Sequence, residues 1–252
     1  MFLTVLYTSV VLLVMTGLCY IVMKRKSNAL IVLVYQKIGD PPKRCSNPRE
    51  WTSVVALTAL LDQLQKHAFS TLSVEQIRQG NLPSKSVFLV FLDGYRSFYQ
   101  KVYPLLEARR MHACVCIPTA AIGTYNQWQN PHQEPWQDLL TRQEVEELSK
   151  NPLICIGAQA LQREDITQLS PQQASYTIQE SLWRLSQIIS RQPEVLAIYP
   201  ARQYSKNTTE LLSHFQGLIL TPKIGLNFPP LQHLKICRGN SIFTKWILWR
   251  MW

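Results

Sequence analysis

Ser86-Val87-Phe88-Leu89-Val90-Phe91-Leu92-Asp93-Gly94-Tyr95-Arg96-Ser97 is the most informative segment of this sequence. Five consecutive apolar residues, Val87 to Phe91, are typical of a strand that is covered on both faces. In folds built from such strands, functional groups gather at the carboxyl ends of the strands. Asp93 stands at that end, where it either belongs to a functional site or caps the helix that follows.

Other apolar strands alternate with helices along the chain. Strands are predicted at 30–35, 113–117, 153–157, 195–199 and 217–220, and helices at 51–66, 97–109, 141–150, 170–191 and 207–215. Capping boxes begin at Ser73 and Thr141, and Ser170 begins a helix with Pro171 at its first position. Residues 123–138 lack periodicity, which predicts a long surface loop. The alternation indicates parallel βα units of an α/β protein.

The amino-terminal segment has the composition of a membrane anchor. Residues 2–23 are an apolar run without a charged side chain, long enough to cross a bilayer as a helix. A secretory signal has its positive charges before the apolar run, whereas Lys24-Arg25-Lys26 follows it here. We therefore expect residues 1–26 to be an uncleaved single-pass anchor and residues 27–252 to be one domain.

The net charge of the chain indicates which classes of partner it could bind. A formal net charge of +10 indicates an anionic neighbour such as lipid headgroups, an acidic glycan or nucleic acid. No basic stripe is interleaved with stacking aromatics, so nucleic acid is not expected. The six cysteines form no metal-like pair and are expected to be free thiols. The Trp-rich tail, 242–252, either lies on lipid or packs on the domain, and the base rate for buried aromatics favours packing.

The segment Val90-Phe91-Leu92-Asp93-Gly94-Tyr95-Arg96-Ser97 resembles the first motif of the NodB-homology polysaccharide deacetylases, T-F-D-D-G-Y-R-S. The resemblance extends over residues 30–220 and implies a distorted (β/α) barrel with fewer than eight units. In that family the first Asp of the motif is the general base and the second is a metal ligand. Leu92 stands in the position of the base, and Asp93 keeps the position of the ligand.

Three further motifs of the family resemble segments of this chain. The motif I-G-S-H-x-x-x-H-P-D-L-T-x-L-S matches residues 156–170, with Gln159 and Arg163 at the two metal-binding His positions. The motif M-Y-H appears as Val34-Tyr35-Gln36, so Gln36 replaces a His. The motif Y-P-Y-G-x-Y is recognisable in Tyr199-Pro200-Ala201-Arg202-Gln203-Tyr204.

These replacements remove the chemistry that the resemblance implies. A catalytic zinc needs three protein ligands and an open position for water, which Asp93 and the Gln159 carbonyl do not supply. We therefore expect no metal cofactor, and zinc only if the family activity survives. Arg163 brings a permanent positive charge to the metal position. We predict that it forms a salt bridge with Asp93, because an unpaired buried carboxylate is costly.

Three functional hypotheses remain. The first is a membrane-anchored pseudo-enzyme retained for glycan or partner binding, with no confident catalytic residue. The second is an active metal-dependent N-deacetylase of an N-acetylhexosamine polysaccharide, and the third is a membrane-surface interaction module. Tyr95, Arg202 and Tyr204 are candidate substrate contacts. With Trp128 and Trp136, the two tyrosines either line a sugar-stacking cleft or pack in the protein.

The two arguments about location disagree. The resemblance implies a bacterial-type inner membrane with the domain in the periplasm. The basic cluster at 24–26 favours a cytoplasmic domain by the positive-inside rule. The glycan and the oligomeric state stay open.

Overall fold

The computed structural model describes residues 29–80, 82–198 and 210–239. The predicted anchor, the third motif from Tyr199 to Tyr204 and the Trp-rich tail lie outside these residues. Within the described ranges, the structure contains no helix that is both long and apolar enough to cross a membrane.

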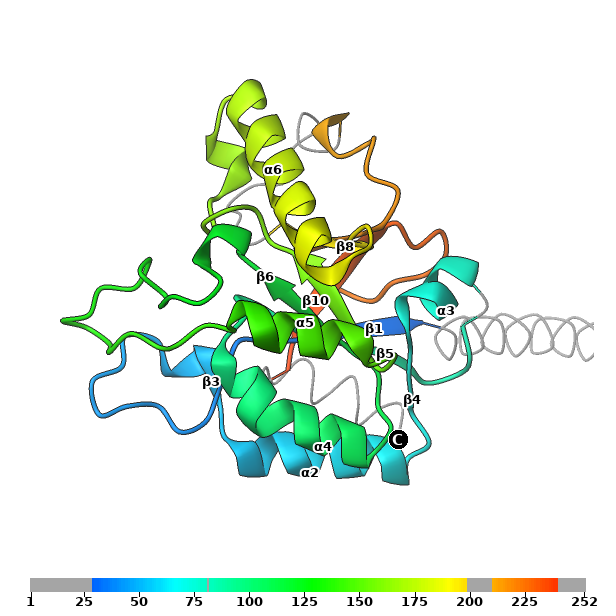
Figure 1. The fold of residues 1–252 in the computed structure, drawn as a ribbon. Coiled ribbons are helices and arrows are strands. Elements are labelled where there is room, and N and C mark those ends of the chain that lie inside the picture. Colours follow the sequence, from blue (N-terminus) through cyan, green and yellow to red (C-terminus); the bar gives the residue numbers. More distant parts are fainter. Residues whose placement is uncertain (1–28, 81, 199–209, 240–252) are drawn as a thin grey trace, which may run out of the picture.

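Seven parallel strands form a closed barrel (Figure 1). Around the ring they are β1 (Leu30–Tyr35), β10 (His233–Arg238), β9 (Leu218–Ile224), β8 (Val195–Ala197), β7 (Ile154–Ala158), β6 (Ala113–Ile117) and β5 (Ser86–Phe91). Pairing of β1 with β5 closes the ring. The two-residue strand β4 (Ser70–Thr71) joins the start of β5. The predicted (β/α) barrel with fewer than eight units is confirmed.

The apolar strands are explained by two buried faces. In β1, Ile31 and Leu33 belong to an outer cluster that packs against helices, whereas Val32 and Val34 belong to an inner cluster that fills the barrel. Successive side chains of a strand point to opposite faces, so a strand buried on both sides is apolar throughout. Cys114 and Cys116, two residues apart on β6, both belong to the inner cluster and are free thiols.

Helices cover the outside of the barrel and one of its ends (Figure 1). The outer helices are α2 (Val54–Lys66), α4 (Tyr103–Ala108), α5 (Arg142–Lys150) and α6 (Pro171–Ile189). The short helix α3 (Val74–Gln79) places Val74 and Ile77 in the inner cluster, which covers the amino-terminal end of the strands. The capping boxes predicted at Ser73 and Thr141 are confirmed, and Ser170, predicted to begin a helix, forms a third capping box.

Two predicted helices begin differently. Trp51–Thr52 form β3, which pairs with β2 (Lys37–Ile38), and α2 begins only after the N-cap Ser53. The segment predicted as helix 97–109 opens with a π-helical turn, η2 (Phe98–Val102), in which the Tyr103 N–H reaches the Phe98 carbonyl. Pro104 has no N–H to continue an α-helical ladder, which accounts for the wider turn.

The carboxyl-terminal part of the barrel departs most from the sequence-based expectation. β8 ends at Ala197, β9 extends to Ile224, and β10 was not predicted. The predicted helix 207–215 begins outside the described residues. The loop at 123–138 is irregular as predicted, but it is anchored, because Asn126 and Glu134 are fully buried.

Candidate functional site

Three motif residues meet at the carboxyl ends of neighbouring barrel strands. Gln36 follows β1, Asp93 lies two residues beyond β5, and Gln159 follows β7. Parallel strands present these ends at the same edge of a sheet, so side chains far apart in sequence converge there. Asp93 and Gln159 are completely buried.

The backbone at Asp93 turns sharply away from the strand. Asp93 and Gly94 have φ values of 69° and 62°, both in the left-handed region. Aspartate tolerates this region better than most residues, and glycine adopts it without strain. A Cβ at Gly94 would also lie 3.0 Å from the Ile117 side chain. The Asp-Gly pair therefore allows the carboxylate to turn into the site.

Both carboxylate oxygens of Asp93 are engaged by side chains at the former His positions. Arg163 Nε donates to Asp93 Oδ1 at 2.6 Å, and Gln159 Nε2 donates to the same oxygen at 2.6 Å. Gln36 Nε2 donates to Oδ2 at 2.7 Å. The predicted salt bridge between Arg163 and Asp93 is confirmed. The amide contact from Gln36 was not predicted.

Gln159 is held at both ends of its amide group. Its Oε1 accepts the Asp93 backbone N–H at 2.9 Å while its Nε2 donates to the Asp93 carboxylate. The carbonyl oxygen is thus directed at a backbone donor. It is not presented as a ligand to a cation.

Arg163 lies between the carboxylate and an aromatic ring. Its guanidinium carbon is 5.3 Å from the centre of the Trp128 ring, a cation–π distance. Trp128 meets Tyr95 edge-on at 6.5 Å. The Arg163 backbone has a φ of 66°. The side chain is only 15% exposed, so its position is fixed by Asp93 on one side and Trp128 on the other.

Tyr95 is a packing residue in this arrangement. It is 3% exposed, and its hydroxyl receives a hydrogen bond from Asn126 at 3.4 Å. Burial raises the pKa of the Tyr95 hydroxyl well above its ordinary value, with a further contribution from the charge of Asp93. A direct contact of Tyr95 with substrate stays a prediction, as do those of Arg202 and Tyr204, which lie outside the described residues.

The donor set does not fit a catalytic metal. Asp93 is the one carboxylate, Arg163 has no lone pair to donate, and the Gln159 oxygen is already paired. In the described part of the chain, no group of three His, Cys, Asp or Glu residues is arranged to hold a metal ion. At the position of the family's general base, Leu92 is 3% exposed and apolar, so it accepts no proton.

A buried ion pair anchors the loop beside the site. Lys37 Nζ lies 2.5 Å from Glu134 Oε1 and 3.2 Å from Glu50 Oε2. Trp51 Nε1 donates to Glu134 at 3.2 Å. Burial raises the pKa of Glu134, but the hydrogen bond and charge of Lys37 outweigh it and leave the pKa below its usual range. Sequence reasoning missed this pair, because nothing in the spacing of Lys37 and Glu134 indicates contact.

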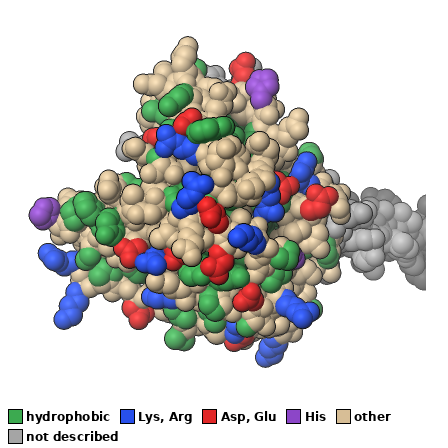
Figure 2. All heavy atoms as spheres, viewed as in Figure 1, with side chains coloured by type: hydrophobic (Ala, Val, Ile, Leu, Met, Phe, Trp, Pro, Cys, Tyr) green, Lys and Arg blue, Asp and Glu red, His purple; other side chains and the backbone are tan. Residues whose placement is uncertain are grey.

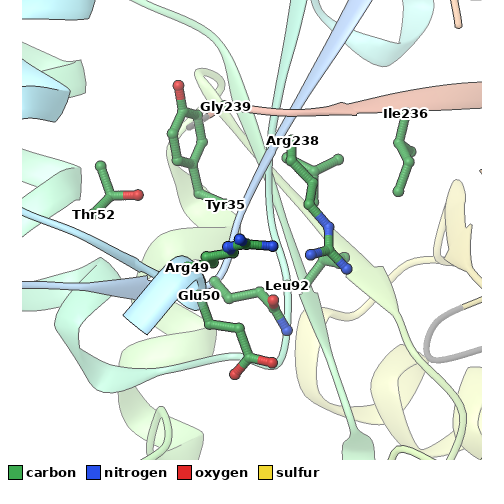
Figure 3. Close-up of a pocket in the computed structure, with 10 residues that line it drawn as sticks. Tyr35, Arg49, Glu50, Thr52, Leu92, Ile236, Arg238 and Gly239 are labelled. Atoms are coloured by element: carbon green, nitrogen blue, oxygen red, sulfur yellow. The ribbon is translucent and has the colours of Figure 1, made fainter. Parts of the chain in front are cut away.

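A small pocket, with a cavity volume of about 20 Å³, opens at the same edge of the barrel (Figure 3). It is lined by Gln36 and Leu92, and by Arg49 and Arg238, which come from the segment before β3 and the end of β10. Sequence reasoning missed both arginines. The alternation of apolar and polar residues over 233–238 was the available signal for the strand that presents Arg238.

Two other surface features lie away from the motif residues. A larger hollow, with a cavity volume of about 660 Å³, is lined by residues of α6 and of the segment 210–215 and contains no motif position. Figure 2 shows basic and acidic side chains interspersed over the visible face, without a continuous basic stripe. The visible face therefore does not have the charge pattern of a nucleic-acid-binding surface.

Comparison with known proteins places this geometry in a family. The family model described as "Polysaccharide deacetylase" matches residues 79–216. A curated relative, the poly-beta-1,6-N-acetyl-D-glucosamine N-deacetylase of Escherichia coli, is 40% identical over 62 residues. That alignment covers 21% of this chain and 9% of the relative, so the chain matches less than a tenth of that protein's length.

Solved structures share the fold at low sequence identity. The Streptococcus pyogenes deacetylase PplD, in complex with acetate, is 19% identical with a TM-score of 0.69 over 86% of this chain and 96% of that one. IcaB from Ammonifex degensii is 14% identical with a TM-score of 0.73 over 89% of this chain and 97% of that one.

Proposed function

The chain belongs to the polysaccharide deacetylase family, and we propose on that premise that it is a catalytically inactive member that binds a glycan. The observation that carries the proposal is the occupation of the Asp93 carboxylate by Arg163, Gln159 and Gln36. We further propose that residues 1–26 anchor it in a membrane, on the strength of the apolar run at 2–23.

The argument for inactivity rests on what deacetylation requires. Hydrolysis of an acetamide needs an activated water and a group that takes its proton. Leu92 offers no proton acceptor, and Arg163 puts a fixed positive charge where a cation would bind. A guanidinium does not coordinate water as a metal ion does, so it does not lower the pKa of a bound water in that way. These side chains therefore supply neither the activated water nor the proton acceptor that the reaction needs.

The argument for glycan binding rests on family membership and on the side chains at the mouth of the barrel. Family membership makes a polysaccharide the first ligand class to test. The small pocket near Asp93 is lined by polar side chains, including Gln36 and Arg49, and by apolar ones such as Leu92. Trp136 and Tyr125 stack on one another in the adjoining loop and are 44% and 50% exposed. Exposed aromatic side chains of this kind suit contact with a sugar ring.

Metal analysis combined with acetate release tests the proposal. The full chain, purified in detergent, is expected to carry no stoichiometric zinc, cobalt or nickel. It is also expected to release no acetate from β-1,6-linked N-acetylglucosamine oligomers supplied with these metals. Bound metal together with acetate release that Asp93→Asn abolishes would establish an active deacetylase instead.

A restored variant makes the negative result interpretable. Leu92→Asp, Gln159→His and Arg163→His together return the base and the two ligands that the family motifs contain. This variant is expected to take up zinc, and the same variant with Asp93→Asn is its control. If the unmodified chain binds zinc as well as the restored variant does, the site is not defective and the proposal is wrong.

A further inference from the structure

We infer that the amino-terminal face of the barrel docks on an anionic phospholipid bilayer, which holds the mouth of the barrel away from the membrane. This docking goes beyond the proposed glycan binding, and it rests on the proposed membrane anchor, residues 1–26. The observations that support it are a group of basic side chains on this face, the position of the face next to the anchor, and the exposed Phe228 beside the first strand.

The amino-terminal face consists of the segments that precede the barrel strands. Because the strands are parallel, these segments lie at one end of the barrel, opposite the motif residues. The helix α3 covers this end, and Figure 1 shows it beside the start of β1. The described segments of the face are 66–69, 74–80, 82–85, 109–112, 150–153, 190–194, 213–217 and 225–232.

Cations outnumber acids on this face. Its segments contain seven lysines or arginines but only two acidic residues, Glu75 and Glu194. Glu194 is paired with Arg78, and Arg109 is paired with Asp62 of α2. Four exposed cations of the face take part in none of the ion pairs between described residues: Lys66, Arg110, Lys150 and Arg191. The face therefore presents a net positive charge to its surroundings.

The carboxyl-terminal end of the barrel does not share this excess. The loops 36–53, 92–97, 118–141 and 159–170 contain six lysines or arginines and seven aspartates or glutamates. Several of these charges are paired with one another, as in the contacts of Lys37 with Glu134 and of Arg163 with Asp93. The two ends of one barrel thus differ in charge, and the positive end is the one nearest the anchor.

Helix capping accounts for only part of the positive charge. Lys66, Arg78 and Lys150 occupy the last turns of α2, α3 and α5, where a cation interacts favourably with the helix dipole. Arg110 and Arg191, in contrast, lie beyond the C-cap residues of α4 and α6. Their charges serve no helix end and are available to a partner outside the barrel.

The face lies within reach of the bilayer in which the anchor would sit. Residues 27–29 are all that separates the proposed anchor from β1, and three extended residues reach about 10 Å at most. The negative potential of anionic lipid extends over about one Debye length, about 8 Å in physiological salt. Cations at this end of the barrel therefore lie where that potential attracts them.

An exposed aromatic side chain lies at the edge of the face nearest the anchor. Asn227 and Leu30 exchange backbone hydrogen bonds of 2.9 and 3.1 Å, so the loop 225–232 lies beside the start of β1. Phe228 is 43% exposed in this loop, which contains no charged residue. Exposed aromatic side chains combined with surrounding cations are typical of surfaces that rest in the headgroup region of a membrane.

Docking of this face determines where the candidate site points. Gln36 and Asp93 lie beyond the carboxyl ends of β1 and β5, and a six-residue strand such as β1 is about 20 Å long. The mouth of the barrel would therefore open to the aqueous phase about 20 Å or more from the lipid surface. A glycan would reach it from the side away from the membrane.

Hydrogen–deuterium exchange of the full chain in liposomes tests the inference. The chain is reconstituted in phosphatidylcholine, with or without about 30% phosphatidylglycerol, and flotation reports its attachment. Backbone amides of 109–112 and 190–194 are expected to exchange at least about threefold more slowly on the anionic liposomes, whereas those of 43–47, at the opposite end, exchange equally on both. About 0.5 M NaCl is expected to abolish the difference, because the Debye length then falls to about 4 Å.

Two variants with the same change in charge show whether the face is responsible. The first removes three exposed cations from the face: Arg110→Gln, Lys150→Gln and Arg191→Gln. The matched control removes three exposed cations from the carboxyl-terminal end: Lys43→Gln, Arg44→Gln and Lys101→Gln. Each cation near an anionic surface raises the ratio of docked to undocked protein about fivefold. The first variant is therefore expected to lose about a hundredfold in this ratio, and with it the slow exchange, which the control keeps.

The outcomes separate the docking face from the anchor. Slow exchange on anionic liposomes that only the first variant loses supports the inference. Equal exchange on both kinds of liposome overturns it, even where flotation with both supports the anchor. Equal loss in the control variant also overturns it, because the effect would then be one of overall charge.

Two further results bear on the anchor and on a different partner. Flotation with anionic liposomes alone, lost in the first variant, overturns the anchor and supports the docking face, whereas flotation with neither overturns both. Slow exchange induced by a single-stranded oligonucleotide on neutral liposomes, without any effect of phosphatidylglycerol, would identify a nucleic-acid surface and overturn the inference.

Discussion

At the residue scale, the site shows how neighbouring side chains can pair with a buried carboxylate. Asp93 is fully buried and accepts hydrogen bonds from one guanidinium and two amide groups. An isolated buried charge would cost several kcal/mol, and breaking such a pair exposes that cost. The replacements at the three former His positions are therefore physically coupled, because each supplies a donor to the same acid.

Removal of the Arg163 side chain is expected to destabilise the fold strongly. Arg163→Ala leaves the Asp93 carboxylate buried with only the two amide donors. We expect a loss of about 2–4 kcal/mol in the free energy of unfolding, measured by urea titration. The positive φ at position 163 destabilises alanine and arginine alike. The difference in unfolding free energy between the two proteins therefore reports the lost ion pair and packing.

A surface pair provides the comparison for this measurement. Arg184 and Glu180 lie 2.7 Å apart on α6, with 45% of the arginine side chain exposed. Arg184→Ala is expected to change the unfolding free energy by less than about 1 kcal/mol. Equal effects of the two substitutions would contradict a coupled, buried cluster around Asp93.

The residues of this cluster were predictable to different degrees. Asp93, Gln159 and Arg163 were identifiable because motif flanks fix their positions, and the charges of Arg163 and Asp93 predict their pairing. The contact from Gln36 depends on how β1 and β5 are staggered in the closed barrel, which no local pattern encodes. Arg238 was missed because its strand was missed.

At the element scale, periodicity predicted the long elements and failed for the short ones. The strands at 30–35 and 113–117 and the helix at 142–150 follow from apolar runs and capping residues. The two-residue strands β2 and β3 pair only with each other and leave no periodic signal. The loop at 123–138 was predicted as irregular. Its attachment through Glu134 depends on a residue 97 positions away.

The Lys37–Glu134 pair is expected to make stability depend on acid pH. The pKa of Glu134 in the folded protein is lower than in the unfolded chain, chiefly because Lys37 outweighs the effect of burial. The stabilisation is therefore present above the usual glutamate range and is lost as the pH falls through it. We expect the melting temperature of the unmodified protein to fall as the pH drops from about 6 to about 3.5.

Glu134→Gln isolates this contribution. The variant is expected to lose about 3 kcal/mol of stability at neutral pH, because Lys37 stays buried with only Glu50 as its acid partner. It should also show a flatter dependence of melting temperature on pH. Glu146→Gln, in an exposed pair with Arg142, should leave the acid dependence unchanged. An unchanged pH profile in Glu134→Gln would show that other carboxylates control acid stability.

At the scale of the whole molecule, the barrel is complete once its first strand is in place. All six residues of β1 are buried, and the strand pairs with β5 on one side and β10 on the other. The inner and outer clusters both draw side chains from it. The strands that form the closed barrel in the described structure therefore begin at residue 30. Among the described residues, the contacts that stabilise β1 come from the barrel itself.

Deletion of residues 1–26 is therefore expected to release a folded barrel from the membrane. The full chain should stay with membranes through an alkaline carbonate wash, because the apolar run at 2–23 is proposed to span the bilayer. The truncated chain should appear in the supernatant. In the same detergent buffer, the two proteins should melt within about 2 °C of each other, which corresponds to well under 1 kcal/mol. A truncated chain that aggregates or melts much earlier would mean that the anchor contributes to the barrel. A full chain extracted by carbonate would mean that the apolar run does not span the membrane.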